Sequence, residues 1–448
     1  MAKITFYGGA GSVTGANFLL DADGHKILVD CGSHESGNIH DPINHGRFPY
    51  DARAIETLIV THAHQDHIGR VPKLLREGFE GIIFSTPATF DLSKVMFDDA
   101  LSVMKHDANR RNCTPIYERK DVDATLRLWK TREYHEPFQV GGLAVEFLDA
   151  GHILGSAMIK LSRGGRSIIF TGDLGNSPEP LLNDTESPAG ANYLVMESVY
   201  GDRQHEHRDE RSDILREAIE STHNRHGTLL IPSFSVERTQ IILFEIHKMM
   251  EEGKIARIPV YLDAPLATRV TEVFRNYKNL LNPGAQEEAM QGDIFSFPGL
   301  TVVRDYDDSI HKAPNPKVII AGAGMSSGGR IRSHEKKYLP DANASVLITG
   351  YQAPGSLGRR IQDGEKNVAI DGEHVKVRAK ISTLTGFSGH KDRDGLLEFV
   401  EKAGESLKQV FVVMGEPKAS QFLAQRIKDF LGVDAVVPRQ GDSVTVEL

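Results

Sequence analysis

The sequence predicts an α/β protein in which short buried strands alternate with amphipathic helices. Short β-branched runs bounded by polar residues, such as Ile55–Val60 and Thr228–Pro232, are typical of buried strands. Longer stretches with helical periodicity, such as Ala88–His106 and Ser212–His223, separate them. This alternation is typical of sheets that are covered by helices.

The first two fifths of the chain are predicted to begin with strands and tight turns. Seven strands are expected, at Lys3–Tyr7, Phe18–Asp21, Lys26–Asp30, Ile55–Val60, Leu143–Leu148, Met158–Leu161 and the run from Arg166. Helices are expected from near Ile68 and at Arg70–Glu77, Ala88–His106 and Lys120–Thr131.

The remainder continues the alternation without an internal repeat. Helices are expected at Ser212–His223, Thr239–Met250 and Ile331–Tyr338. Strands are expected at Thr228–Pro232, Pro259–Leu262, Lys317–Ala321 and Gln409–Val413. A last helix is predicted to begin at Pro417 and to end at Gly432, because proline favours the first helical turn and glycine the position after the last.

Composition sets wide limits on function. The chain has 448 residues, 25% of them charged, and a net charge of −9, which gives no global basic signature for nucleic acids but excludes no local one. Cys31 and Cys113 are the only cysteines, so no disulfide framework is expected. Since the sequence has neither a signal peptide nor a membrane-spanning run, we expect a cytoplasmic protein that does not bind membranes.

A cluster of metal-ligand residue types follows the strand at Ile55–Val60. His62, His64, Asp66 and His67 fall within six residues. Imidazole nitrogens and carboxylate oxygens are the usual ligands of zinc, and His62 and His64 can project the same way from an extended chain. A surface cluster of histidines is the alternative, but this spacing after a buried strand favours metal.

Two later strand ends add candidate ligands. His152 lies between glycines after Leu143–Leu148, and Asp173 follows the strand that begins at Arg166. His152 is a plausible further ligand for the ion at His62 and His64, and Asp173 could bridge two ions. Asp30 ends an earlier strand and is expected either to orient a ligand histidine or to cap a turn.

The order and spacing of these motifs resemble the metallo-β-lactamase superfamily. Further segments narrow the resemblance to the β-CASP nucleases, and within them to the prokaryotic relatives of the cleavage and polyadenylation endonuclease subunit. They are Met196–Arg203, Ile231–Phe234, Leu262–Pro265, Gly324–Arg330 and Gly386–His390. The resemblance implies a four-layer αβ/βα sandwich with an inserted α/β domain. The expected domains are 1–203, the β-CASP insert 204–375, and 376–448, where the first domain returns.

The resemblance also implies roles for individual residues. His62, His64 and His152 would bind a first zinc, Asp66 and His67 a second, and Asp173 would bridge the two. Glu197 and His390 resemble the carboxylate–histidine pair of the family. Thus Asp66, Glu197 and His390 are the expected catalytic residues, with His390 protonating the leaving oxygen.

Substrate contacts are expected in two segments. Ser326, Gly328, Gly329 and Arg330 precede the helix predicted from Ile331, where exposed backbone amides and an arginine suit phosphate oxygens. Arg359 and Arg360 are candidates for the phosphate backbone, against the alternative of ordinary solvated arginines.

One departure from the family concerns Met414. RNA-processing members carry a histidine there, which completes the second metal site, and a thioether is a poor ligand for zinc. Of the two expected zinc sites, the second could therefore bind weakly, or water or another residue could take the vacant ligand position. The DNA-processing branch also has an apolar residue at this position.

These observations predict a zinc-dependent ribonuclease that hydrolyses single-stranded RNA, as an endonuclease with 5′-exonuclease action as a further mode. The alternatives are a weakened or inactive RNA-binding subunit and a nuclease directed at DNA. A small-molecule hydrolase is disfavoured, because such relatives lack the inserted domain. Self-association into a homodimer is a further expectation.

Overall fold

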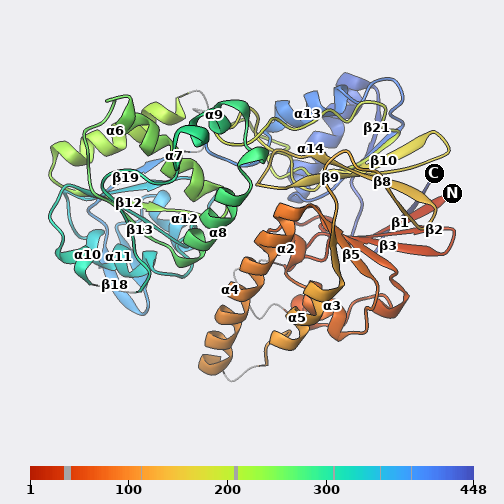
Figure 1. Ribbon diagram of the computed structural model, residues 1–448, viewed down its shortest axis with the longest axis horizontal. Helices are drawn as coiled ribbons and strands as arrows, with labels where there is room; N and C mark the ends of the chain where they lie inside the picture. Colours follow the sequence, from red (N-terminus) through yellow and green to blue (C-terminus); the bar gives the residue numbers. More distant parts are fainter. Residues whose placement is uncertain (35–41, 112–113, 206–209, 306–307, 354, 385) are drawn as a thin grey trace. The chain divides into compact units, whose positions relative to one another are not determined.

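The computed structural model describes residues 1–34, 42–111, 114–205, 210–305, 308–353, 355–384 and 386–448. Cys113 lies outside these residues. The chain forms two compact units, one made of Met1–Gln204 with His390–Leu448 and one of His205–Gly389. In Figure 1 the second unit is drawn largely in green to light blue, and the first in red to yellow and dark blue.

The first unit contains two seven-stranded mixed sheets. One has the strand order β22-β1-β2-β3-β4-β5-β6. Its strands are β1 (Ala2–Gly8), β2 (Asn17–Ala22), β3 (His25–Val29), β4 (Thr57–Ile59), β5 (Ile82–Ser85), β6 (Trp129–Thr131) and β22 (Ser443–Val446). The pairs from β3 to β6 are parallel, so the carboxyl ends of β3, β4 and β5 lie at one edge.

The other sheet of this unit has the order β21-β20-β11-β10-β9-β8-β7. Its strands are β7 (Phe138–Val140), β8 (Leu143–Asp149), β9 (Ala157–Arg163), β10 (Arg166–Phe170), β11 (Tyr193–Met196), β20 (Gln409–Val412) and β21 (Asp434–Val436). The neighbours β10, β11 and β20 are parallel, so Asp173, Glu197 and Met414 all follow strands that end on the same side.

The two sheets pack face to face around a buried apolar core. Phe6 and Phe18 of the first sheet and Phe147, Phe170 and Phe411 of the second belong to one cluster. The opposite face of the second sheet is covered by α13 (Arg393–Glu401) and α14 (Pro417–Arg426), whose apolar residues form a separate cluster with it.

The remaining helices of this unit follow the strands of the first sheet. They are α1 (Pro42–His45), α2 (Gln65–Ile68), α3 (Val71–Arg76), α4 (Pro87–Arg111) and α5 (Arg119–Leu128). Helix α4 contacts the edge strand β6, and α5 contacts β5 beside it. The expected α/β class and the sandwich of two sheets between helical layers are confirmed.

The second unit is built on a six-stranded parallel sheet with the order β14-β13-β15-β12-β16-β19. Its strands are β12 (Thr228–Pro232), β13 (Val260–Asp263), β14 (Leu300–Val302), β15 (Lys317–Ala321), β16 (Ser345–Ile348) and β19 (Lys380–Thr383). The hairpin of β17 (Asn367–Ile370) and β18 (Glu373–Lys376) lies between β16 and β19 in the sequence, and its apolar residues belong to the core of this sheet.

Seven helices of the second unit are described. They are α6 (Arg211–Asn224), α7 (Arg238–Glu251), α8 (Pro265–Asn276), α9 (Pro283–Gln291), α10 (Ser309–Lys312), α11 (Ile331–Tyr338) and α12 (Leu357–Gln362). Of the helices within the described ranges, none combines the length and the apolar character that crossing a membrane requires.

Two expectations about local structure are wrong. The helix expected over Lys120–Thr131 ends at Leu128, because Trp129–Thr131 pairs with β5 as a parallel strand. The helix expected from near Ile68 already begins at Gln65 as α2, so Asp66 and His67 lie on a helical turn rather than before it.

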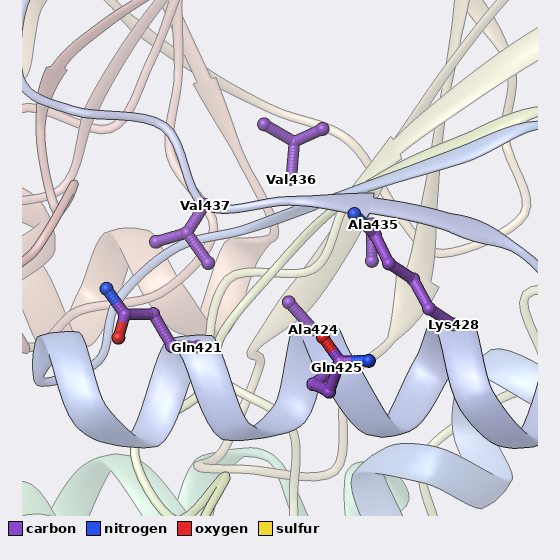
Figure 2. Close-up of a pocket in the computed structure, with 7 residues that line it drawn as sticks. All are labelled: Gln421, Ala424, Gln425, Lys428, Ala435, Val436 and Val437. Atoms are coloured by element: carbon purple, nitrogen blue, oxygen red, sulfur yellow. The ribbon is translucent and has the colours of Figure 1, made fainter.

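A groove in the first unit lies between α14 and β21 (Figure 2). It is lined by Gln421, Ala424, Gln425, Lys428, Ala435, Val436 and Val437. None of these is a candidate site residue, so the groove is not part of the predicted chemistry.

Candidate metal centre

The turn from β4 to α2 carries the first four candidate ligands. Backbone hydrogen bonds hold it against the loop after β3, where Cys31 N donates to His67 O (2.8 Å), and against the segment before β2, where Ala16 N donates to Asp66 O (2.9 Å). A Cβ atom on Gly32 would lie 1.5 Å from the Asp66 carbonyl oxygen, so only glycine permits this approach. The position of this turn therefore depends on two neighbouring loops of the first sheet.

Three imidazoles converge on one point. His64 Nδ1 lies 3.1 Å from His62 Nε2 and 3.2 Å from His152 Nε2. Asp173 Oδ2 lies 3.4 Å from both of those Nε2 atoms. The four potential ligand atoms all lie within 4.8 Å of one another, which is the separation expected of atoms around one ion.

Asp66, His67 and Asp173 form a second group of the same kind. His67 Nε2 lies 3.3 Å from Asp173 Oδ1 and 3.9 Å from Asp66 Oδ2. Asp173 thus presents one carboxylate oxygen to each group, as a bridging ligand would. Both sets of residues expected from the sequence are brought together.

Asp30 and Thr61 hold one histidine of each group in place through hydrogen bonds. The buried Asp30 carboxylate accepts hydrogen bonds from Thr61 N (2.8 Å), Thr61 Oγ1 (2.8 Å) and His67 Nδ1 (2.7 Å). Because the Thr61 hydroxyl proton goes to Asp30, its oxygen accepts from His62 Nδ1, 3.0 Å away. Both histidines therefore carry a proton on Nδ1 and turn Nε2 towards the cluster. Burial lowers the pKa of His67, but the Asp173, Asp30 and Asp66 carboxylates raise it well above its usual range, so this ring has to lose its Nε2 proton before it binds a metal ion.

The open question on Asp30 is thus answered by its bond to His67, which makes it an orienting carboxylate. Thr61 was not among the residues expected at the site. Its position directly before His62 is the one signal in the sequence that could have suggested it.

Glu197 and His390 form a third group with Asp173. Glu197 Oε1 accepts from Leu174 N (2.7 Å) and pairs with His390 Nδ1 (3.1 Å). Burial lowers the pKa of His390, but the Glu197 and Asp173 carboxylates raise it to about 9. The ring is therefore protonated near neutral pH and lies beside the candidate metal ligands, against the ring of His152.

The protonation states of the cluster suit a cation. Burial lowers the pKa of His62 and His64, which leaves both rings neutral. Burial would raise the pKa of Asp173, but His67, His62 and His390 hold it well below its usual range. A neutral imidazole and an ionised carboxylate are the forms that bind metals.

Two buried atoms point to a group that completes the site. Among the described residues, His67 Nε2 and Asp173 Oδ1 have no hydrogen-bond partner. Buried polar atoms are normally satisfied, and a metal ion between these two would satisfy both. Together with a donor set of imidazoles and carboxylates, this fits zinc.

The loop expected to contact phosphate is held from within the second unit. Ser326 is buried and its hydroxyl donates to Glu335 (2.5 Å). Arg330 donates to the buried Asp263 carboxylate (2.6 Å) and to Arg304 O (3.1 Å). The Arg330 guanidinium thus braces the loop in this structure, and its expected contact with substrate stays a prediction.

The two glycines of this loop differ. A Cβ on Gly329 would lie 2.4 Å from Gly322 O, and its φ is +73°, so the turn requires glycine there. Around Gly328 the structure leaves open space, so its backbone can be approached from solvent.

Arg359 and Arg360 lie on α12 and pair with nearby carboxylates. Arg359 Nε lies 3.0 Å from both oxygens of Asp363, and Arg360 donates to both oxygens of Glu365. Binding of a phosphate backbone by this pair, which stays a prediction, would compete with these contacts.

Met414 follows β20 and is buried. Its backbone bridges Gly9 O and Ser198 N, and its φ is +47°. The sulfur packs beside Gly9, since a Cβ atom on Gly9 would lie 2.5 Å from the sulfur and 3.2 Å from the ring of Phe18. Met414 is thus a core residue next to the site, without an imidazole to offer.

Comparison with known families assigns three consecutive segments of the chain. Residues 12–221 match the metallo-beta-lactamase superfamily, 239–361 the Beta-Casp domain, and 374–438 the Zn-dependent metallo-hydrolase RNA specificity domain. Ribonuclease TTHA0252 of Thermus thermophilus is 36% identical over 99% of this chain and 100% of its own length. The chain belongs to the β-CASP ribonuclease family of the metallo-β-lactamase superfamily. It is accordingly a metallo-hydrolase, and the predicted family is confirmed.

Other relatives agree with this assignment. The transcription termination factor FttA of Pyrococcus horikoshii is 30% identical, over 99% of this chain and 70% of its own length. The RNase J-like protein of Methanocaldococcus jannaschii is 30% identical over 98% of this chain and 99% of its own. A crystal structure of a protein of unknown function from Enterococcus faecalis V583 shares the fold, with a TM-score of 0.59 at 12% identity over 99% of this chain and 100% of its own.

The family match and the division into compact units place the start of the C-terminal domain at different residues. The RNA specificity match begins at residue 374, near the expected return at 376, whereas the second compact unit extends to Gly389 because β19 belongs to its sheet. The expected domains 1–203, 204–375 and 376–448 therefore stay a prediction.

Proposed function

We propose that this protein is a zinc-dependent ribonuclease that hydrolyses phosphodiester bonds in single-stranded RNA. The observation that carries the proposal is the convergence of His62, His64 and His152 on Asp173, with the Glu197–His390 pair beside it. The names of the relatives at 30 to 36% identity support RNA as the substrate.

Each residue has a role in this proposal. His62, His64 and His152, with Asp173, would hold one zinc ion, and Asp66 and His67 would share Asp173 around a second. Bound zinc would supply a Lewis acid and lower the pKa of water at the scissile bond. Asp30 and Thr61 keep the Nε2 atoms of His62 and His67 directed at the ions.

His390 is the proposed general acid. Its Nδ1 faces Glu197, so the second proton of the charged ring is on Nε2, from which it can pass to the leaving oxygen. The Glu197 carboxylate is held by Leu174 N and Val199 N and positions the ring. In the absence of that carboxylate, burial would favour the neutral ring, which has no second proton to give.

The test is incubation of the zinc-loaded protein with end-labelled RNA and DNA oligomers. We expect RNA to be cut, and we expect Asp66→Ala and His390→Ala to slow cleavage at least about 100-fold. His25→Ala, at an exposed histidine far along the first sheet from the ligand turn, serves as the control and should leave the rate unchanged. Stable RNA binding without any cleavage would instead favour the RNA-binding subunit, and cleavage of DNA alone would favour the DNA-directed nuclease.

We further propose that the second of the two zinc sites is weak, because Met414 leaves it with only Asp66, His67 and the shared Asp173. Met414→His should raise the zinc content per chain and the cleavage rate. Histidine tolerates the positive φ of this position better than most residues.

Zinc content is measured by elemental analysis after dialysis against metal-free buffer. Met414→Leu, which keeps the apolar volume, should match the wild type. If Met414→His leaves both metal content and rate unchanged, Met414 does not occupy the position of a missing ligand.

A further inference from the structure

A row of cations follows the second strand of the hairpin in the second unit. From residue 374 to 380 exposure alternates strictly: Val375, Val377 and Ala379 are buried in the core, while the residues between them are exposed. Three of the exposed residues are Lys376, Arg378 and Lys380, which we call the cationic row. Because the buried residues face the core, the three cations point to solvent.

The row has no carboxylate to neutralise it. Within the described part of the chain, no Asp or Glu oxygen lies within 4.0 Å of these three side chains. The two acidic residues of the hairpin turn are taken by α11: Asp371 pairs with Arg332 (2.8 Å) and Glu373 with Lys336 (3.1 Å).

The neighbours across the hairpin are neutral as well. Lys376 lies opposite Asn367, and His374 lies opposite Ala369. Like charges at alternate residues of the chain lie close enough to repel one another. In a chain with a net charge of −9, three adjacent unpaired cations are a local exception that a polyanion would stabilise.

We propose that the cationic row of Lys376, Arg378 and Lys380 binds the phosphate backbone of single-stranded RNA, apart from the residues that cut it. The row runs from the end of β18 to the start of β19, and several charges at alternate residues along the chain suit a linear polyanion better than a single small anion. The row also falls within residues 374–438, which match the RNA specificity domain. This inference rests on the proposed function for its choice of RNA.

An anionic membrane is the other partner that such a row could attract. Interfacial membrane binding normally adds apolar anchors to the basic residues. Among the described residues, the large exposed apolar side chains lie elsewhere, and none belongs to residues 366–380. The chemistry of the hairpin therefore favours RNA.

The test replaces the row by Lys376→Gln, Arg378→Gln and Lys380→Gln together. A matched control, Lys3→Gln with Lys418→Gln and Arg439→Gln, removes the same charges from exposed positions of the first unit that also lack ion pairs among the described residues. Binding of a labelled single-stranded RNA of about 20 nucleotides is measured by fluorescence anisotropy over a salt series. Both triple variants are combined with His390→Ala and loaded with zinc, so that the RNA stays intact.

We expect the row variant to bind RNA about tenfold more weakly near 50 mM salt, with the slope of log affinity against log salt reduced by about 2, since each lost phosphate contact removes about 0.7. The control should match its parent in both. Folding is checked by hydrolysis of bis(4-nitrophenyl) phosphate with His390 intact, which should not change because the row contains none of the residues proposed to bind zinc or to cut the diester.

Equal RNA affinity and salt slope in the row variant and the control would overturn the inference. So would loss of binding to phosphatidylserine vesicles with RNA binding intact, which would assign the row to a membrane. If the wild type hydrolyses neither RNA nor the small diester, the proposed function fails, while a weaker affinity of the row variant for RNA would still support the row as an RNA-binding element.

Discussion

At the scale of single residues, Asp30 orients two histidines of the candidate metal site. Its carboxylate accepts a hydrogen bond from His67 Nδ1 and another from the Thr61 hydroxyl, whose oxygen in turn accepts from His62 Nδ1. Removing such a support typically weakens metal binding by 10- to 100-fold, even though the support never touches the ion.

Asp30→Asn should therefore lower zinc affinity by about 10- to 100-fold, because an amide puts an NH2 donor in place of one oxygen and cannot accept all three bonds from Thr61 N, Thr61 Oγ1 and His67 Nδ1. The measurement is competition with a chromophoric chelator. Asp23→Asn, at an exposed carboxylate that pairs with Arg163, is the control and should keep the wild-type affinity. An affinity of Asp30→Asn equal to that of the control would show that Asp30 does not orient the ligands.

A second prediction concerns Glu335, which lies beneath the loop from Gly324 to Arg330. Burial raises its pKa from 4.5 to about 8, against the hydrogen bond from Ser326 and the charge of Arg332. The folded state therefore holds a proton that the unfolded state releases. The resulting stabilisation is complete below pH 4.5 and is lost as the pH rises through about 8.

Glu335→Gln keeps the shape of the side chain and removes this titration. Its free energy of unfolding should fall less than that of the wild type between about pH 6 and 9, so that the variant gains relative stability with rising pH. Urea unfolding across that range measures the difference. Parallel pH profiles for the two proteins would show that Glu335 does not hold its proton in the fold.

Residue types and spacing are sufficient to predict that the candidate ligands converge, but not which residues support them. His62, His64, His152 and Asp173 each follow a strand at a recognisable motif, so their convergence could be expected. The pairing of Arg330 with Asp263 could not, because nothing in either segment indicates a partner 67 residues away.

At the scale of elements, the site depends on loops that approach one another closely. A Cβ on Gly175 would lie 1.8 Å from Gly151 O, so the loop that carries Asp173 touches the loop that carries His152. Gly175 N also donates to Ala150 O (2.8 Å). Gly175, two residues after Asp173, therefore sets how closely the loops that carry the candidate ligands His152 and Asp173 approach each other.

Gly175→Ala should push the two loops apart, which costs about 1–3 kcal/mol of stability and weakens zinc binding. Gly292→Ala is the control, because a Cβ there meets nothing within 4 Å and its φ of 178° suits any residue. Thermal unfolding with and without zinc gives both quantities. If Gly175→Ala behaves like the control, the loops do not need this contact.

Strands and helices were predicted well where their own pattern of apolar residues is enough to define them. Thr228–Pro232 and Ile331–Tyr338 lie where expected. The helix expected from Lys120 was extended to Thr131, and only the pairing of Trp129–Thr131 with β5 makes these three residues a strand. Pairing between distant segments is the information that a local pattern lacks.

At the scale of the whole molecule, the order of motifs along the chain was enough to predict the family and the inserted domain. The boundary at the return could not be placed in the same way, because β19 is joined to the sheet of the second unit by backbone pairing rather than by a motif. The net charge of −9 was equally uninformative about nucleic-acid binding, because it sums the acidic candidate ligands with local groups of cations.

The central claim is that His62, His64, His152 and Asp173 hold a zinc ion. The most direct measurement is anomalous diffraction at the zinc edge from crystals of the zinc-loaded protein. The account predicts a strong peak among His62 Nε2, His64 Nδ1, His152 Nε2 and Asp173 Oδ2, with a weaker one beside Asp66 and His67. Zinc bound elsewhere, or no peak among these four atoms, would contradict it.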